Sequence, residues 1–185
     1  MRMHYKSLFS MLRQRRLNET QATDTYFSSH RSIEGYTCAQ VYYGLKSKRL
    51  AIYGMRTKGE FLDTYRDFIR DVGAPHTLRR DNAREEDTKG VKESNRKLII
   101  KDQFTEPYHP QQNPAELNAC KFIKQHTQTL MDRVGAPPDL WYGAAEYVTH
   151  VYNRCANESI DWEVPLTKST GDTIDISHML LYHGS

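Results

Sequence analysis

Residues 22–54 read ATDTYFSSHRSIEGYTCAQVYYGLKSKRLAIYG and contain three short runs rich in β-forming residues. The runs are Ala22–Ser28, Tyr36–Tyr43 and Arg49–Gly54, and the polar segments between them include Ser-His-Arg-Ser and Lys-Ser-Lys. Val, Ile, Tyr, Phe and Thr fit a pleated, half-buried surface, whereas clusters of small polar residues favour turns. The stretch therefore predicts a meander of three antiparallel strands.

The rest of the chain predicts helices alternating with strands. Apolar residues recur at helical spacing over 61–72, and Gly73 ends that helix. The later expected elements are a strand at His76–Arg80, a polar helix at Glu86–Arg96, a strand at Leu98–Ile100, a long helix from Pro114 to about Val134, and a last helix from Trp141 to about Cys155. This order predicts an α/β (α+β) domain with a mixed central sheet of about five strands flanked by helices, which resembles ribonuclease H-like domains.

Composition is typical of one globular domain. The chain has 185 residues, is 38% hydrophobic and 11% aromatic, and carries a net charge of +3. Its apolar runs are short, so we expect neither a membrane span nor a signal peptide. The three cysteines are far apart and odd in number, which favours reduced, buried thiols. We expect a basic, partly helical lead-in over residues 1–20, a core over 21–157 and an irregular C-terminal extension over 158–185.

Basic residues gather in several short clusters, although each cluster alone is more often a solvated surface. The clusters are Arg13 with Arg15 and Arg16, Lys46 with Lys48 and Arg49, Arg79 with Arg80 and Arg84, and Lys121 with Lys124. Together they make a phosphate backbone a plausible partner, because neutralising phosphates releases condensed counterions.

Three carboxylates stand out by position. Asp24 lies inside an expected strand, where acidic residues are disfavoured, Asp81 follows a strand, and Glu116 lies in the first turn of the long helix. Each also has a structural explanation: Asp24 as a strand-end residue, Asp81 as the start of a turn, and Glu116 as part of a capping box with Asn113.

The phase of the long helix favours a buried position for Glu116. At 100 degrees per residue, several apolar residues lie within about 60 degrees of it. They are Cys120, Ile123, Leu130, Met131 and Val134. A carboxylate along a buried stripe needs a partner, such as a metal ion.

Several motifs together resemble the catalytic core of a copia-type LTR retrotransposon integrase, within the retroviral integrase superfamily. The spacing from Asp81 to Glu116 is 35 residues (116 − 81), as in that family. Two matching motifs surround the later carboxylates: Asp81-Asn82-Ala83-Arg84-Glu85 and Pro107-Tyr108-His109-Pro110-Gln111-Gln112-Asn113. A third, Leu17-Asn18-Glu19-Thr20 followed by Ala22-Thr23-Asp24-Thr25, contains Asp24. A fourth lies after the core and runs from Pro165-Leu166-Thr167 through Gly171 to Asp175-Ile176-Ser177-His178. The resemblance covers roughly residues 17–180, with the integrase catalytic core at 21–157.

The resemblance implies a metal-dependent polynucleotidyl transferase that performs 3′-end processing and strand transfer of retroelement DNA. Asp24, Asp81 and Glu116 are then the catalytic residues and hold two Mg²⁺ (or Mn²⁺) ions, with Asp24 bridging both. The DNA-binding residues expected beside them are Gln112, Asn113, Lys121 and Lys124. The implied partners are retroelement ends, target DNA and further copies of the chain. The implied location is the nucleus, after cytoplasmic virus-like particles.

The motifs also depart from the family pattern. Pro114 stands where a glycine is usual, Ala83 and Arg84 replace a glycine pair, and Glu116 lies one residue nearer to Asn113. Because glycine permits conformations that these residues resist, we expect a stiffer loop. The upstream zinc-binding module and the downstream DNA-binding tail are not found, so we expect an isolated core. Two other functions remain open: a decayed or domesticated core that binds DNA or protein without catalysis, and a ribonuclease H-type nuclease.

Overall fold

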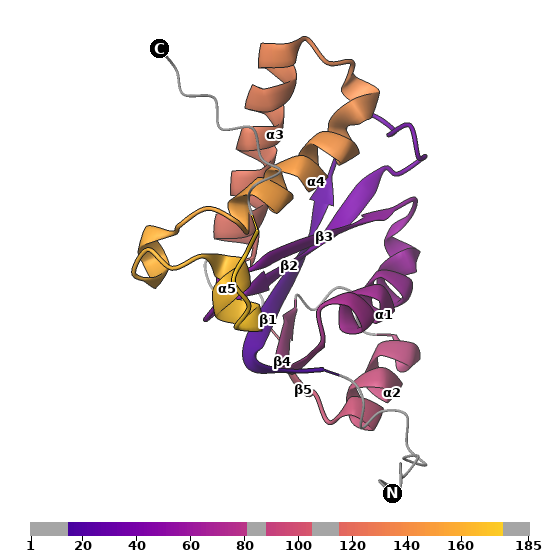
Figure 1. Cartoon of the computed structure of the whole chain (residues 1–185). Helices are drawn as coiled ribbons and strands as arrows, with labels where there is room; N and C mark the ends of the chain where they lie inside the picture. The colour runs from indigo at the N-terminus through magenta and orange to yellow at the C-terminus, as the bar shows by residue number, and fades with distance from the viewer. Residues whose placement is uncertain (1–14, 81–87, 105–114, 176–185) are drawn as a thin grey trace, which may run out of the picture.

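A five-stranded mixed sheet forms the centre of the molecule (Figure 1). The computed structural model describes residues 15–80, 88–104 and 115–175, without the side chains of residues 115–117. The strand order is β3-β2-β1-β4-β5. Pairing is antiparallel from β3 through β2 to β1 and parallel from β1 through β4 to β5. The predicted antiparallel meander is thus confirmed, and β1 is the central strand.

The strands are β1 (Arg16–Phe27), β2 (Cys38–Gly44), β3 (Leu50–Met55), β4 (Ala74–Arg80) and β5 (Lys101–Phe104). Every residue of β2 is buried, because both faces of the sheet are covered there. Residues of β5 are all exposed, as suits an edge strand that is held through its backbone pairing with β4.

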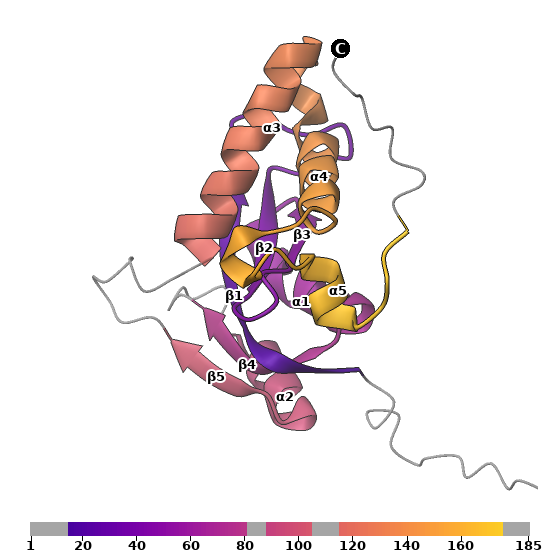
Figure 2. The ribbon, with the colours of Figure 1, turned by 60° about the vertical axis from the view of Figure 1, so that its left-hand side comes forward.

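Helices cover both faces of the sheet. On one face α1 (Phe61–Asp71) and α2 (Lys89–Leu98) pack with Tyr42 and Leu78. On the other face η4 (Ala115–Cys120), α3 (Lys121–Val134) and α4 (Trp141–Tyr152) pack with Val41 and Ile52. Figure 2 shows α3 and α4 side by side, with the far end of α3 extending beyond the sheet. Short 3-10 turns complete the fold at η2 (Lys58–Glu60), η5 (Pro138–Leu140) and η6 (Glu158–Ile160).

The expected boundary between a lead-in over 1–20 and the core is wrong. β1 begins at Arg16, and Arg16 and Leu17 pair with Ala74 and Pro75 before a shift in register. Leu17 is buried in the core cluster beneath α1, and this packing holds the N-terminal part of the strand, which precedes the β-rich run. Residues 1–14 lie outside the described part of the chain.

The strand expected at Leu98–Ile100 is also wrong. Leu98 is the last residue of α2, and Ile99 adopts a left-handed conformation that ends the helix. The Arg16 guanidinium donates hydrogen bonds to the carbonyls of Leu98 and Ile99, which satisfies two acceptors at this helix end. α2 begins at Lys89 with Thr88 as its N-cap, and the expected start at Glu86 lies outside the described residues.

The C-terminal extension is not irregular as expected, because η6 and α5 (Pro165–Thr170) are helical. The last long helix ends at Tyr152 rather than Cys155. Asn153 then turns inward, and its side chain accepts from the Leu50 amide and donates to the Leu50 carbonyl. Consequently Cys155 is exposed, although Cys38 is buried as predicted.

Candidate functional site

Asp24 lies in the C-terminal half of β1, opposite Val41 of β2. Side chains alternate between the faces of a strand, so Asp24 shares its face with Ala22 and Tyr26. Ala22 and Val41 belong to the core cluster beneath η4, α3 and α4, and Tyr26 packs against that cluster. Asp24 therefore lies on the face that is covered by these helices. Because its side chain is partly exposed, it is at the rim of the core.

The strand is held firmly on both sides of Asp24. Thr23 donates a hydrogen bond to the Val41 carbonyl at 2.9 Å, and Thr25 donates to the Gln40 side chain at 2.9 Å. The Gln40 amide in turn donates to the Thr23 hydroxyl. This ladder on the opposite face fixes the register of β1 and β2, and with it the position of Asp24.

The end of β4, which precedes Asp81 in the chain, is anchored by an ion pair between a buried arginine and a partly exposed aspartate. Arg80 is 0% exposed, and its Nε lies 3.2 Å from Oδ1 of Asp102 on β5. Asn95 also donates to Asp102 and accepts from the Tyr65 hydroxyl. The sequence analysis grouped Arg80 with Arg79 and Arg84 in a basic surface cluster, and the structure corrects this for Arg80, whose guanidinium lies inside the fold. Asp81 itself lies outside the described residues.

The segment that carries Glu116 packs on the strand that carries Asp24. η4 contacts both β1 and β2, and Ala119 is buried in the same cluster as Ala22. Cys120 is near Tyr26: burial and then the Cys120 thiol raise the pKa of the Tyr26 hydroxyl. Cys120 is therefore a packing residue, as predicted.

The helical phase assumed for Glu116 needs correction. η4 is π-helical, with more residues per turn than an α-helix, so 100 degrees per residue does not apply over 115–120. Farther along, Ile123 and Met131 are buried as predicted, but Val134 is 72% exposed because α3 extends beyond the sheet there. The Glu116 side chain is not among the described ones, so its inward direction stays a prediction.

The predicted DNA-binding residues fall into two groups. Lys121 and Lys124 are exposed on the first turns of α3. Gln112 and Asn113 lie outside the described residues. Within the described part of the chain no three His, Cys, Asp or Glu side chains form a metal-binding group, and both Asp81 and the side chain of Glu116 lie outside that part.

Sequence reasoning missed one carboxylate of β1. Glu19 is buried, and its two oxygens accept hydrogen bonds from the Gln21 side chain, the Lys46 amide, and the amide and hydroxyl of Ser47. These donors saturate it, so Glu19 shapes the β2–β3 turn. In the sequence, Glu19 is marked only by its position just before a β-rich run, which does not distinguish it from a solvated glutamate.

Three solved structures with the same architecture are retroviral. The chain superposes on a chain of the simian T-cell lymphotropic virus intasome in complex with PP2A regulatory subunit B56 gamma, with a TM-score of 0.70 and 13% identity. The superposition covers 86% of this chain and 56% of the intasome chain. It also superposes on the HTLV-2 integrase catalytic core domain in complex with magnesium, in its trimeric form, with a TM-score of 0.64, 13% identity and coverage of 83% and 97%. The fold is that of a retroviral integrase catalytic core.

The dimeric form of that HTLV-2 core gives a TM-score of 0.57 at 16% identity, over 75% of this chain and 88% of that one. No protein-family model matches the chain, and no curated protein is significantly similar to it. The predicted fold class, a mixed sheet flanked by helices in the ribonuclease H-like arrangement, is confirmed by the integrase-core fold. No helix among the described residues has the length and apolarity needed to cross a membrane.

Proposed function

We propose that this chain is the catalytic core of a polynucleotidyl transferase that integrates DNA, with Asp24, Asp81 and Glu116 as its metal-binding carboxylates. The observation that carries the proposal is the placement of Asp24 at the rim of the core on β1. This strand lies between the one that leads to Asp81 and the helical segment that contains Glu116.

The strand register supports a common site for the two aspartates. β1 and β4 are parallel neighbours, and their last paired residues are Ala22 and Arg79. Asp24 and Asp81 each follow their member of this pair by two residues. Continuation of the pairing would place them side by side, at a separation close to the usual spacing of neighbouring strands, about 4.8 Å.

The donor set fits Mg²⁺ or Mn²⁺, because hard divalent cations prefer carboxylate oxygens. Asp24 would contact both ions, and Asp81 and Glu116 one each. Two such ions, when bound, stabilise the attacking and the leaving oxygen of an in-line displacement at phosphorus. The chain's own contribution is to fix the position of Asp24 through the hydrogen bonds among Thr23, Gln40 and Thr25.

DNA is the proposed substrate. Lys121 and Lys124 extend from the helix that follows Glu116 and would hold phosphates near the reacting group, with Gln112 and Asn113 contacting DNA ends. More specifically, we propose that the chain comes from a copia-type retroelement and performs 3′-end processing followed by strand transfer. We also propose that it acts as a homo-oligomer in the nucleus, which it enters from cytoplasmic virus-like particles.

The activity is tested with a branched DNA substrate that reports strand joining in Mg²⁺ or Mn²⁺. The native chain should join it, and Asp24→Asn, Asp81→Asn and Glu116→Gln should each abolish joining because amides keep the shape but lose the charge. Lys124→Ala should weaken DNA binding and lower its salt slope by about one, whereas Lys92→Ala on α2 should not. A folded, metal-binding native chain that joins no DNA substrate would instead favour the decayed, DNA-binding module.

A further inference from the structure

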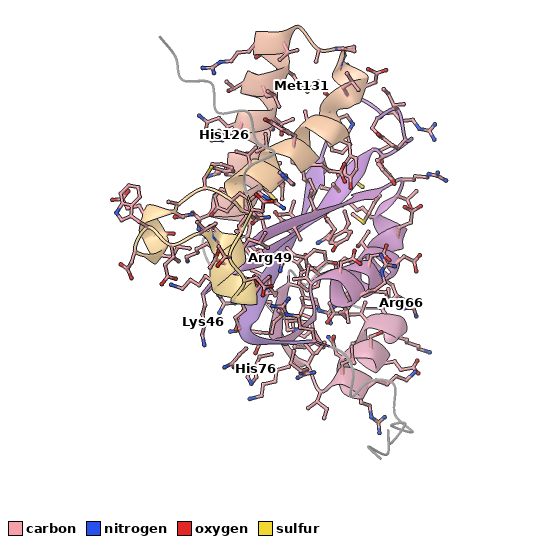
Figure 3. The ribbon with its side chains drawn as sticks, in the orientation of Figure 1. Lys46, Arg49, Arg66, His76, His126 and Met131 are labelled. Atoms are coloured by element: carbon pink, nitrogen blue, oxygen red, sulfur yellow. The ribbon has the colours of Figure 1, made fainter. Side chains whose placement is uncertain are left out.

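A cavity of about 570 Å³ lies beside the candidate site, between the end of β1, α3 and the segment that enters α4. Its size is within the range of small-molecule sites in proteins. The lining residues that matter here are Tyr26, Phe27, Lys124, Thr127, Met131 and Trp141. Met131, labelled in Figure 3, lies where α3 approaches α4.

Two buried polar atoms of this lining have no hydrogen-bond partner among the described residues. They are Nε1 of Trp141 and the hydroxyl of Thr127, on side chains that are 3% and 2% exposed. Buried polar groups are nearly always paired, since an unpaired one costs on the order of a lost hydrogen bond. By contrast, the buried Thr149 hydroxyl on α4 donates to the Ala145 carbonyl. Both side chains line the cavity, so a ligand that reached these two atoms would satisfy them.

The remaining lining includes aromatic rings, a lysine and one carboxylate, Asp132, which accepts a hydrogen bond from the Gln128 side chain. The rings of Tyr26 and Trp141 have centroids 5.5 Å apart. Phe27 is 53% exposed, and the Lys58 ammonium lies 4.7 Å from its ring centroid. Lys124 is exposed at the rim. Aromatic faces beside ammonium groups suit a nucleobase attached to a phosphate, because every base has a face that stacks and every nucleotide carries a negative charge.

The cavity is also within one or two nucleotides of the proposed carboxylates. Tyr26 follows Asp24 by two strand residues, which is about 7 Å. Lys124 follows Glu116 by eight residues through η4 and the first turn of α3, and because a π-helix rises less per residue than an α-helix, the two positions are at most about 12 Å apart along the axis. A nucleotide next to a reacting phosphate could therefore reach the cavity.

We propose that this cavity binds an unpaired nucleotide of the DNA substrate, with the Trp141 indole N–H and the Thr127 hydroxyl bonding the edge of its base and Lys124 holding its phosphate. This assignment rests on the proposed DNA function. It adds a base-recognition site beside the carboxylates that neither the sequence motifs nor the fold similarity supplies.

The test measures the affinity of the whole chain for three duplexes without divalent metal: one with a single unpaired terminal nucleotide, one with an abasic residue there, and one blunt. The unpaired base should tighten binding about tenfold over the abasic residue, since stacking one base contributes about 1–3 kcal/mol. Thr127→Val and Trp141→Phe should each reduce this preference about fivefold. Equal binding of the base and the abasic residue would overturn the proposal.

Thr149→Val is the matched control, because it removes a buried threonine hydroxyl outside the cavity and should keep the preference. The two valine variants should also differ in stability: Tm should fall for Thr149→Val, which loses a hydrogen bond, but not for Thr127→Val. If the preference survived in both Thr127→Val and Trp141→Phe, the site would be refuted.

The same experiment separates this site from the catalytic proposal. Asp24→Asn should keep the base preference while losing DNA joining. A base preference in a chain that joins no DNA supports the nucleotide site and contradicts the activity alone. Joining without any base preference contradicts the nucleotide site alone. A dimer that Thr127→Val dissociates, with base preference unchanged, would assign the cavity to a second copy and overturn the proposal.

Discussion

Glu19 and Asp24 are both acidic residues of β1, but their surroundings give Glu19 a structural role and leave Asp24 for the proposed metal site. The Glu19 carboxylate is enclosed by donors of the β2–β3 turn, and a Cβ at Gly44 would lie 2.8 Å from its oxygens. This packing leaves no room for a ligand. Asp24 lies partly exposed at the rim of the core, which is why we propose it, and not Glu19, as a metal-binding residue.

Arg80 gives the sharpest prediction at the residue scale. Arg80→Leu should lower the free energy of unfolding by about 3 kcal/mol, because it leaves the Asp102 carboxylate without its cationic partner. Urea unfolding measures this. Arg79→Leu is the matched control: its guanidinium donates to the exposed Gln103 side chain, so we expect less than about 1 kcal/mol. Equal effects of the two substitutions would show that the ion pair does not anchor β4.

The residue scale also shows why the site was only partly predictable. Asp24 was found because an acidic residue inside a β-rich run is unusual. Arg80 was misassigned because its burial depends on Asp102, 22 positions away, on a strand that the sequence did not reveal. Pairings between distant residues leave no mark in local composition.

Among the elements, α2 and β5 show how packing overrides local pattern. The apolar run Leu98–Ile100 predicted a strand, yet the chain forms β5 from the polar residues that follow it. An edge strand needs only backbone groups to pair with β4, so its side chains carry little signal. The β1–β2–β3 meander, in contrast, was predictable because β-forming residues fill its strands and polar segments separate them.

Ile99 supplies the prediction at the element scale. It is a β-branched residue with φ of 54°, and it is 82% exposed, so the conformation is strained and little packing offsets it. Ile99→Gly should raise the free energy of unfolding by about 1 kcal/mol. Ile33→Gly, at another exposed isoleucine whose φ is not positive, should lower it by a few tenths to about 1 kcal/mol. Thermal melts of the two variants check this, and a loss of stability in Ile99→Gly would contradict it.

The whole molecule is held by apolar clusters on both faces of one sheet, and tyrosines take part in both. Burial raises the pKa of the hydroxyls of Tyr43, Tyr53, Tyr65 and Tyr142 above their usual 10. Raised folded-state values mean that stability is fully present below pH 10 and is lost as pH rises further. The burial of these tyrosine hydroxyls therefore makes the protein sensitive to alkali.

Urea unfolding between pH 8 and pH 11 checks this sensitivity. The free energy of unfolding should fall above about pH 10, by as much as 1.4 kcal/mol per pH unit for each titrating tyrosine. Tyr142→Phe should make the decline shallower because one raised group is removed. Tyrosinate absorbance that rises fully near pH 10 while far-ultraviolet circular dichroism stays native would contradict the account.

At the same scale, the central claim is that β1, the end of β4 and η4 bring three carboxylates into one metal site. Titration calorimetry with Mn²⁺ on the native chain tests it most directly. We predict that the native chain binds two ions and that its Tm rises in their presence. Both effects should be lost in Asp24→Asn, Asp81→Asn and Glu116→Gln. Both should remain in Glu34→Gln, which alters an exposed carboxylate outside the site. Binding that is absent from the native chain, or unchanged in all three amide variants, would contradict the metal site.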